Sequence, residues 1–281
     1  VTGVFLRTAD FDPSTGIANL TSVGGQDVFI AKYDSNGNYL WAKRIGGIAT
    51  ENVYDIVVDN IGQIYVAGHF QVTADFDPTV ATTANLISTG GSEAFIAKYD
   101  TDGNYLWAKA MGGTLDDIAY SLTLNNSGQI YIAGRFGGTA DFDPSTGIAN
   151  LISTGSQDVF LAKYDTDGNY IWAKAIGGTG SDSANNIALN GSDQVIVTGY
   201  FLGTADFDPS VGTANLTSTG SQDIFIAKYD SNGNYIWAKA IGGTSLDNAT
   251  AIALDSSDQI FITGFFAGTV DFDPSVGTVN F

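Results

Sequence analysis

One segment recurs four times along the chain, and its spacing limits the folds that the chain can adopt. Residues 27–47 read DVFIAKYDSNGNYLWAKRIGG, and the tryptophan that marks this segment, Trp41, returns as Trp107, Trp172 and Trp237. Successive copies are therefore about 65 residues apart, and so regular a period indicates a tandem repeat of one supersecondary unit. Both faces of the segment are mostly apolar, so each copy needs a neighbour on each side.

The recurring segment has the pattern of a β-hairpin. Two β-rich runs flank a polar loop in which Asp34 can accept hydrogen bonds from the loop amides and Gly37 can adopt a left-handed conformation. If Asp34 pairs with Asn38, simple alternation places Trp41 and Lys32 on opposite faces of the hairpin.

Each full repeat is expected to hold four short strands, which in the second repeat span residues 54–58, 64–70, 94–99 and 105–111. Residues 1–11 read as one further strand. The connections carry turn residues and no helical period, so the predicted class is all-β. Four antiparallel strands with apolar residues on both faces are typical of a propeller blade, and a solenoid is the alternative.

We therefore predict a β-propeller built from four repeats of about 65 residues, each a four-stranded antiparallel blade, with overlapping N- and C-terminal partial blades. The whole of residues 1–281 is expected to form one repeat domain. Its expected parts are a partial blade at 1–47, blades at about 48–113, 114–178 and 179–243, and a partial blade at 244–281.

Several spaced motifs resemble those of bacterial SBBP-type β-propeller repeat proteins. They are IALDSSDQIFITG at residues 252–264, an Asp-Phe pair, FIAKYDSNGNYIWAK at residues 225–239 and a Gly-Gly pair. The resemblance covers nearly the whole chain and implies a secreted or cell-surface bacterial propeller. It implies little about activity. The hairpin turn also resembles the Asp-box, a structural turn of other propellers.

The most distinctive polar motif is Asp-Phe-Asp-Pro, which occurs five times. Its two carboxylates point the same way from an extended chain, and calcium, which takes six to eight oxygen ligands, is a candidate cofactor. The candidate calcium ligands are Asp10, Asp12, Asp75, Asp77, Asp141, Asp143, Asp206, Asp208, Asp271 and Asp273, with Ser14, Ser145, Ser210 and Ser275 as further oxygen donors.

A structural interpretation of the same motif competes with calcium and is favoured. One aspartate would cap the turn, and the other would pair with a lysine, because an unpaired charge packed between blades is costly. Eight of the 11 basic residues occupy two repeated positions, which are those of Lys32, Lys98, Lys163 and Lys228 and of Lys43, Lys109, Lys174 and Lys239.

Two further repeated positions could bind a ligand. An acidic residue follows each Gly-Gly pair, at Glu51, Asp117, Asp182 and Asp247, either at the rim of a binding face or, as the favoured interpretation, in a solvated turn. The aromatic faces of Trp41, Trp107, Trp172 and Trp237 suit stacking on a sugar, although packing between blades is the favoured interpretation.

Composition and symmetry exclude several classes of function. The net charge of −19 repels nucleic acids and anionic lipid, the absence of cysteine excludes disulfides and cysteine-based zinc sites, and no apolar run is long enough to cross a membrane. Near-identical repeats do not supply the asymmetric set of groups that catalysis needs, so we expect no enzyme. A hydrolase that uses paired aspartates is the least favoured class.

The favoured function is that of a non-catalytic, extracellular or cell-surface module that acts in scaffolding or self-association. The alternative is a calcium-dependent, glycan-binding lectin with one weak site per blade. Joining residues 251–254 to the N-terminal strands would complete a fourth blade, after which residues 1–11 and 260–272 compete for one place. We therefore expect the ends to pair with a second copy, or the chain to be a segment of a longer array or larger ring.

Overall fold

The computed structural model describes residues 1–79, 82–274 and 279, and the chain divides into two compact units, residues 1–119 and 120–281. Within the described ranges every regular element is a β-strand, which confirms the all-β prediction. No helix in that part of the chain is long and apolar enough to span a membrane.

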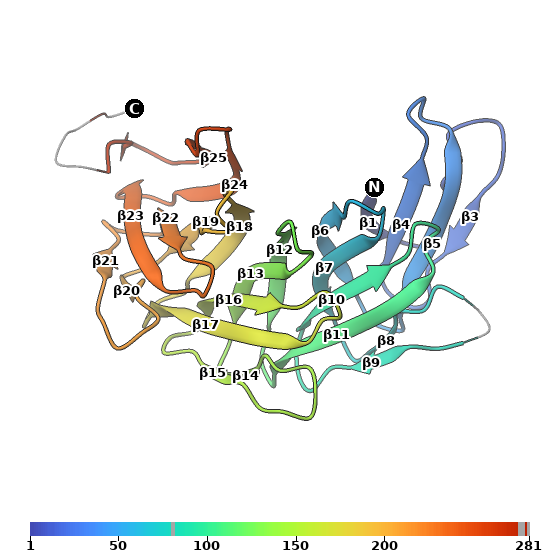
Figure 1. The fold of residues 1–281 in the computed structure, drawn as a ribbon, viewed down its shortest axis with the longest axis horizontal. Coiled ribbons are helices and arrows are strands. Elements are labelled where there is room, and N and C mark those ends of the chain that lie inside the picture. The colour runs from blue at the N-terminus through green and yellow to red at the C-terminus, as the bar shows by residue number, and fades with distance from the viewer. Residues whose placement is uncertain (80–81, 275–278, 280–281) are drawn as a thin grey trace. The chain divides into compact units, whose positions relative to one another are not determined.

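The first unit contains the four strands of one complete repeat and most of those of another. Strands β6, β7, β10 and β11 pair in that order, each antiparallel to the next, and Figure 1 shows them side by side. A second sheet has the order β1-β4-β5-β8-β9. The strands are β1 (Thr2–Phe5), β2 (Thr8–Asp10), β3 (Asn19–Thr21), β4 (Asp27–Tyr33), β5 (Tyr39–Gly47), β6 (Asn52–Val58), β7 (Ile64–Phe70), β8 (Thr73–Asp75), β9 (Asn85–Ile87), β10 (Glu93–Tyr99) and β11 (Tyr105–Gly113).

The second unit repeats this pattern. Its sheets have the orders β12-β13-β16-β17-β20-β21 and β18-β19-β22-β23-β26, and β24 pairs with β25. The strands are β12 (Ile118–Leu124), β13 (Ile130–Phe136), β14 (Thr139–Asp141), β15 (Asn150–Ile152), β16 (Asp158–Tyr164), β17 (Tyr170–Gly178), β18 (Ser183–Leu189), β19 (Val195–Phe201), β20 (Thr204–Asp206), β21 (Asn215–Thr217), β22 (Asp223–Tyr229), β23 (Tyr235–Gly243), β24 (Asn248–Leu254), β25 (Ile260–Phe265) and β26 (Val270–Asp271).

The four strands of the second repeat lie where the sequence predicts them, to within two residues at each end. The prediction of a single strand at residues 1–11 is wrong, because a break in the strand follows Phe5 and Arg7 adopts a positive φ of 60°. The same break follows the second strand of every repeat. Glycine occupies the positive-φ position in the later copies, at Gly138, Gly203 and Gly268.

The loop that carries Asp-Phe-Asp-Pro contains a small hairpin that the sequence did not predict. In the second unit this hairpin is β20–β21, and β20 pairs with the Gly177–Gly178 end of β17, the fourth strand of the preceding repeat. The β5–β8 pairing in the first unit is equivalent. Each such sheet therefore extends from the main strands of one repeat into the next repeat, and backbone hydrogen bonds join the two.

The turn between β4 and β5 forms as predicted, but the register of the hairpin differs from the predicted one. The Asp34 amide bonds to the Asn38 carbonyl and Gly37 has a φ of 82°. A bulge follows, because Leu40 has no partner and Trp41 pairs with Lys32. The two side chains therefore share a face, and the expectation that they lie on opposite faces is wrong. An inserted residue reverses the alternation, since side chains have a period of two along a strand.

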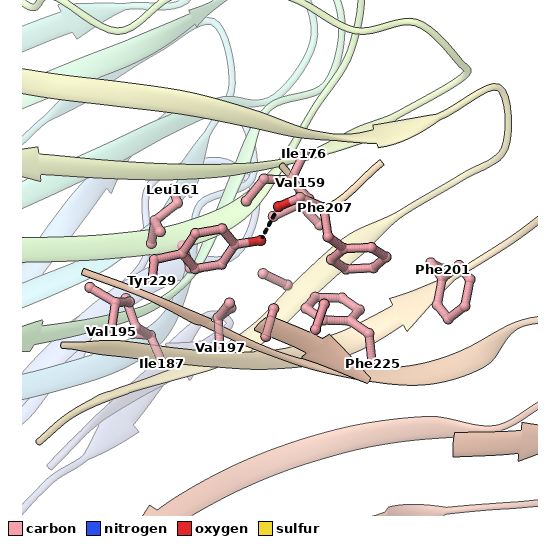
Figure 2. Close-up of a cluster of buried hydrophobic side chains, with 14 of the residues drawn as sticks. Val159, Leu161, Ile176, Ile187, Val195, Val197, Phe201, Phe207, Phe225 and Tyr229 are labelled. Carbon is pink, nitrogen blue, oxygen red and sulfur yellow. Dashed lines mark hydrogen bonds between the residues drawn. The ribbon is translucent and has the colours of Figure 1, made fainter. Parts of the chain in front are cut away.

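The core of the second unit lies between successive sheets. Figure 2 shows Val159 and Leu161 of β16 packed towards Val197 of β19 and Tyr229 of β22. All four side chains are almost completely buried. Each Å² of buried apolar surface stabilises the folded state by about 25 cal/mol, so this contact between repeats is a main source of stability.

Candidate functional site

The carboxylates of the Asp-Phe-Asp-Pro loops bind their own backbone. Asp10 Oδ1 accepts hydrogen bonds from the Asp12 amide at 3.0 Å and the Ala18 amide at 2.8 Å, and Asp12 Oδ1 accepts one from the Ser14 amide at 2.9 Å. The amide bonds hold the pKa of Asp10 below its usual range. The arrangement recurs at Asp75/Asp77, Asp141/Asp143 and Asp206/Asp208. Both aspartates of each pair therefore cap the loop.

The phenylalanine between the two aspartates anchors the loop in the core. Phe142 is fully buried. The centre of its ring lies 5.7 Å from that of Phe136, which it meets edge-on, and 4.8 Å from that of Phe160. The hydroxyl of the buried Tyr164 donates a hydrogen bond of 2.9 Å to the Phe142 carbonyl. The same bond joins Tyr229 to the Phe207 carbonyl (Figure 2) and Tyr99 to the Phe76 carbonyl. The loop is thus fixed at both its carboxylates and its aromatic ring.

The expected pairing of loop aspartates with Lys32 and Lys163 is wrong. Lys32 Nζ donates to the Thr101 carbonyl at 2.9 Å, and Lys163 Nζ donates to the Ser231 carbonyl at 3.3 Å. Each acceptor lies in the hairpin turn of the following repeat. Lys163 Nζ also lies 4.7 Å from the centre of the Tyr131 ring, a cation–π contact. These lysines therefore link neighbouring repeats and do not neutralise the loops.

The second repeated lysine position does act on a loop aspartate. Although burial opposes it, hydrogen bonds from Thr82 and Thr79, together with the charge of Lys43, keep the pKa of Asp77 below its usual range. The described residues contain no group of three or more histidine, cysteine or acidic side chains that could hold a metal ion. Calcium at these loops stays a prediction, and Ser275, one of its expected donors, lies outside the described residues.

The acidic residues that follow each Gly-Gly pair lie in the interior. Glu51, Asp117, Asp182 and Asp247 are at most 1% exposed, so the expectation of a solvated turn is wrong. Each lies beside a second buried acid, which starts the third strand of the preceding repeat and was not among the candidate residues of the sequence. The four acid pairs are Asp27/Glu51, Glu93/Asp117, Asp158/Asp182 and Asp223/Asp247.

The pair Asp158/Asp182 shows how these side chains are held. Asp182 accepts hydrogen bonds from the Gly178 amide at 2.9 Å and the Leu202 amide at 3.0 Å. Asp158 Oδ2 accepts one from the Thr154 amide at 2.9 Å, and Asp158 Oδ1 is buried without a hydrogen-bond partner. Asp182 therefore connects the end of β17 to the turn before β20, at the junction of two repeats.

A glycine leaves the room for the acid pairs Asp27/Glu51 and Asp158/Asp182. A Cβ atom on Gly177 would lie 2.7 Å from Asp182 Oδ2 and 2.8 Å from Asp158 Cγ. A Cβ atom on Gly46 would likewise meet Asp27 Cγ and Glu51 Oε2, both at 2.7 Å. Since such contacts are too short for any side chain, glycine at this position is required by the two carboxyl groups above it.

Burial perturbs the titration of these groups. Burial, helped by the neighbouring carboxylate and opposed by the hydrogen bonds that each group accepts, raises the pKa of Asp182 to about 6 and that of Asp223 to about 6. It raises the pKa of Glu51 to about 7, with Asp27 acting in the same direction and Arg44 against it. Perturbed groups of this kind are concentrated at functional sites, although structural networks produce them too.

The first acid pair carries its own cation. Arg44 Nη1 lies 2.7 Å from Asp27 Oδ2, with the arginine side chain 32% exposed and the aspartate fully buried. Alanine stands at the corresponding position of the other three repeats, at Ala110, Ala175 and Ala240. The first pair is therefore balanced by an arginine that the later pairs lack.

The tryptophans lie partly buried between successive repeats. The Trp172 ring meets that of Tyr131 edge-on at 6.2 Å and lies against Gly233 in the hairpin turn of the following repeat. Trp41 lies in the same way against Gly103 and lines a cavity of about 450 Å³. No indole is completely enclosed, so sugar stacking stays a prediction.

Comparison with known proteins shows weak relatives. No family model matches the chain. An uncharacterised WD repeat-containing protein of Acanthamoeba polyphaga mimivirus is 29% identical over 94% of this chain, and the regulatory protein FlaEY of Caulobacter vibrioides is 30% identical over 73% of it. The chain spans 23% and 22% of the length of these relatives. These relatives support the interpretation of the chain as a repeat protein that resembles a β-propeller.

Proposed function

We propose that the chain is a non-catalytic β-propeller segment that acts as a scaffold, with each repeat forming one blade. The observation that carries this proposal is the use of the repeated polar residues. Lys32 and Asp182 hydrogen-bond to backbone groups of the neighbouring repeat, Tyr164 anchors a loop of its own repeat, and their equivalents recur along the chain. Side chains that hold loops and repeats together in this way are not available for chemistry, and the pattern suits a rigid body that presents a surface.

The exposed surface supports a role in binding macromolecules. The bulge at the start of each fourth strand exposes an apolar side chain to between 40% and 50%, at Leu40, Leu106, Ile171 and Ile236. Equivalent apolar side chains that recur along a repeat protein suit a repetitive partner, and a second copy of the chain meets that description.

The edge of β25 favours self-association. In the described part of the chain β25 pairs with β24 alone, whereas the equivalent strands β7, β13 and β19 have a partner on each side. Phe266, next to this edge, is 46% exposed, although its equivalents Phe70, Phe136 and Phe201 are fully buried. An open apolar edge takes up a further strand readily.

Light scattering on the purified chain tests self-association. Species larger than a monomer at micromolar concentration, lost in Ile262→Pro, support pairing through β25. Proline at that position removes a backbone donor from the strand. A monomer at all concentrations contradicts self-association and leaves the scaffold proposal to be tested by pull-down with the exposed bulge residues changed to serine.

The extracellular or cell-surface location in bacteria is part of the same proposal. It is supported by the resemblance to SBBP-type repeats and by the acidic composition. Fractionation of cells that express the parent protein tests it: recovery in the cytoplasmic fraction alone contradicts it.

Glycan binding is the second candidate, because Trp41 and Lys32 line the same cavity of about 450 Å³. An indole face beside a polar group suits a sugar ring. Binding on a glycan array that is lost in Trp41→Ala and depends on calcium would favour this function over scaffolding, and a blank array contradicts it.

A further inference from the structure

One position in the second strand of each repeat carries a different residue in every copy. It lies between a glycine and a phenylalanine that are the same in all copies, and its occupants are Val4, His69, Arg135, Tyr200 and Phe265. In β13 and β19 this residue is the only one of seven that is not buried. On a chain of closely similar repeats, a varied and accessible position is where each repeat can recognise a different part of a partner.

A β-bulge in the first strand of the repeat presents a second variable side chain. The register of β18 against β19 shifts between Ala184 and Asn186, which leaves Asn185 unpaired in the ladder. The same shift occurs at Tyr54 of β6 and at Thr250 of β24. The side chain at the bulge therefore differs between copies, although the bulge itself recurs.

The glycine before the variable position makes room for the bulge. A Cβ atom on Gly199 would overlap the Ser183 carbonyl oxygen, and one on Gly68 would overlap the Asn52 carbonyl oxygen. A bulge re-aims a side chain, and bulges are frequent next to functional sites. Each copy thus keeps the glycine and the bulge while the side chains that they present change.

The two variable side chains of a repeat contact each other. The Arg135 guanidinium lies over the Tyr120 ring, 5.6 Å from its centre, and the rings of Tyr54 and His69 lie 5.7 Å apart. Arg135 Nε is buried and makes no hydrogen bond, and Arg135 forms no ion pair with the residues that the structure describes. An aromatic ring therefore holds this guanidinium in place without a carboxylate to neutralise it.

The strands that carry these side chains are neighbours within the second unit. Asn186 Nδ2 donates a hydrogen bond of 3.3 Å to Ser121 Oγ, which brings β18 against β12. Asn185 Nδ2 donates one of 2.6 Å to Asn248 Oδ1, and Asn248 is the cross-strand partner of Phe265. We call this set of residues the variable face: Tyr120, Arg135, Asn185, Tyr200, Thr250 and Phe265.

The side chains of the variable face suit a polypeptide partner. Tyrosine and arginine are enriched among the residues that dominate binding in protein interfaces, and asparagine adds adaptable hydrogen bonds. A guanidinium that is already held in place can bind a carboxylate through two parallel hydrogen bonds. The net charge of −19 repels polyanions, so this carboxylate has to belong to a segment that is neutral or basic overall.

We propose that the variable face of the second unit binds a polypeptide segment that is neutral or basic overall and places one carboxylate on Arg135. This role rests on the scaffold function proposed above and specifies the kind of partner that the scaffold holds. Tyr120 positions the guanidinium, and Asn185 and Tyr200 contact the residues that flank the carboxylate.

A peptide array tests this binding with the full chain at physiological ionic strength. Each neutral or basic peptide is synthesised with one glutamate beside an aromatic residue, and again with glutamine in place of the glutamate. The glutamate forms should bind, and the glutamine forms should bind about tenfold more weakly. In Arg135→Tyr, which introduces the residue that the following repeat carries at this position, the preference for glutamate should disappear. Arg7→Gln is the matched control, because it removes an exposed arginine outside the variable face, and the preference should persist.

Equal binding of the glutamate and glutamine forms, or a preference for glutamate that survives in Arg135→Tyr, would overturn the proposal. Binding to a glycan array that is lost in Arg135→Tyr would assign the face to sugars and overturn it too. A wild-type chain that binds no peptide would also overturn it. Light scattering then shows whether the scaffold function fails as well, since self-association through β25 does not use Arg135.

Discussion

The carboxyl groups of Asp158 and Asp182 converge on Gly177, so close that a methyl group there would lie 2.8 Å from one and 2.7 Å from the other. Asp182 also accepts hydrogen bonds from the Gly178 and Leu202 amides, at the point where the fourth strand of one repeat pairs with the next repeat. Two like charges are thus buried where successive repeats are joined. The stability of the junction depends on this relationship.

Gly177→Ala should destabilise the protein by about 3 kcal/mol, because the added methyl group overlaps both carboxyl groups and backbone or side chains must shift. Urea denaturation measures the effect. Gly191→Ala is the control, since nothing lies within 4 Å of its added methyl group, and it should change stability by less than about 0.5 kcal/mol. Equal urea midpoints for the two variants would contradict the described packing.

Stability of the metal-free protein should fall as pH rises from 5 to 8. Burial raises the pKa of Asp182 and Asp223 to about 6 and that of Glu51 to about 7, so the folded state binds their protons more tightly than the unfolded state. Their contribution is complete below the unfolded pKa of about 4 and is lost as pH rises through 6 to 7. Between pH 5 and 8 each of these aspartates accounts for about 1 to 2 kcal/mol, because part of its contribution is already lost below pH 5.

Among the charged groups that face these acids, the carboxylates raise the pKa of their neighbours, and only Arg44 lowers it. Asp158 faces Asp182, Asp247 faces Asp223, and Glu51 faces both Asp27 and Arg44. Melting temperatures across this range provide the measurement, and Asp182→Asn should flatten the profile. A melting temperature that rises steadily from pH 5 to 8 would show that the acids are not buried as described.

Tyr164→Phe should cost about 1 to 2 kcal/mol, because it leaves the buried Phe142 carbonyl without its hydrogen bond. Tyr33→Phe removes the equivalent bond to the Phe11 carbonyl, which is only partly buried, so its cost should be smaller. Chemical denaturation of both variants compares the two sites. A larger loss in Tyr33→Phe would contradict the assignment of the bond as an interior anchor.

Gly37→Ala should cost about 1 kcal/mol through backbone conformation alone. Gly37 has a φ of 82°, and nothing lies within 4 Å of an added Cβ atom, so no steric overlap contributes. Gly37→Asn should cost less, since asparagine tolerates the left-handed region. Thermal melts of the two variants should therefore rank alanine below asparagine, and the reverse order would contradict the turn conformation.

Much of the fold could be predicted from the sequence because turn chemistry and alternation are local signals. Asp34 and Gly37 fix the hairpin turn, and the apolar runs fix the strands. The bulge after the turn could not be predicted, since nothing near Leu40 distinguishes an unpaired residue from a paired one. The β20–β21 hairpin was missed because three-residue strands carry too little pattern.

The acid pairs show where sequence reasoning about the site fell short. Glu51 and its equivalents were noticed as repeated acids, but a Gly-Gly pair and variable neighbours favoured a solvated loop. Their burial arises from the packing of one repeat against the next, which the local sequence pattern does not show. A signal for the second acid was present all the same: Asp27, Glu93, Asp158 and Asp223 directly precede the apolar run of each third strand.

Titration of the aspartate side-chain carboxyl carbons by carbon-13 NMR, on the metal-free protein, tests most directly whether buried acid pairs join the repeats. Asp182→Asn assigns its signal, and Asp10, whose amide bonds lower its pKa, is an internal reference for an exposed loop aspartate. The account predicts that Asp182 titrates near pH 6, about two units above an ordinary aspartate. A midpoint near 4 for Asp182, close to that of a solvated carboxyl group, would contradict it.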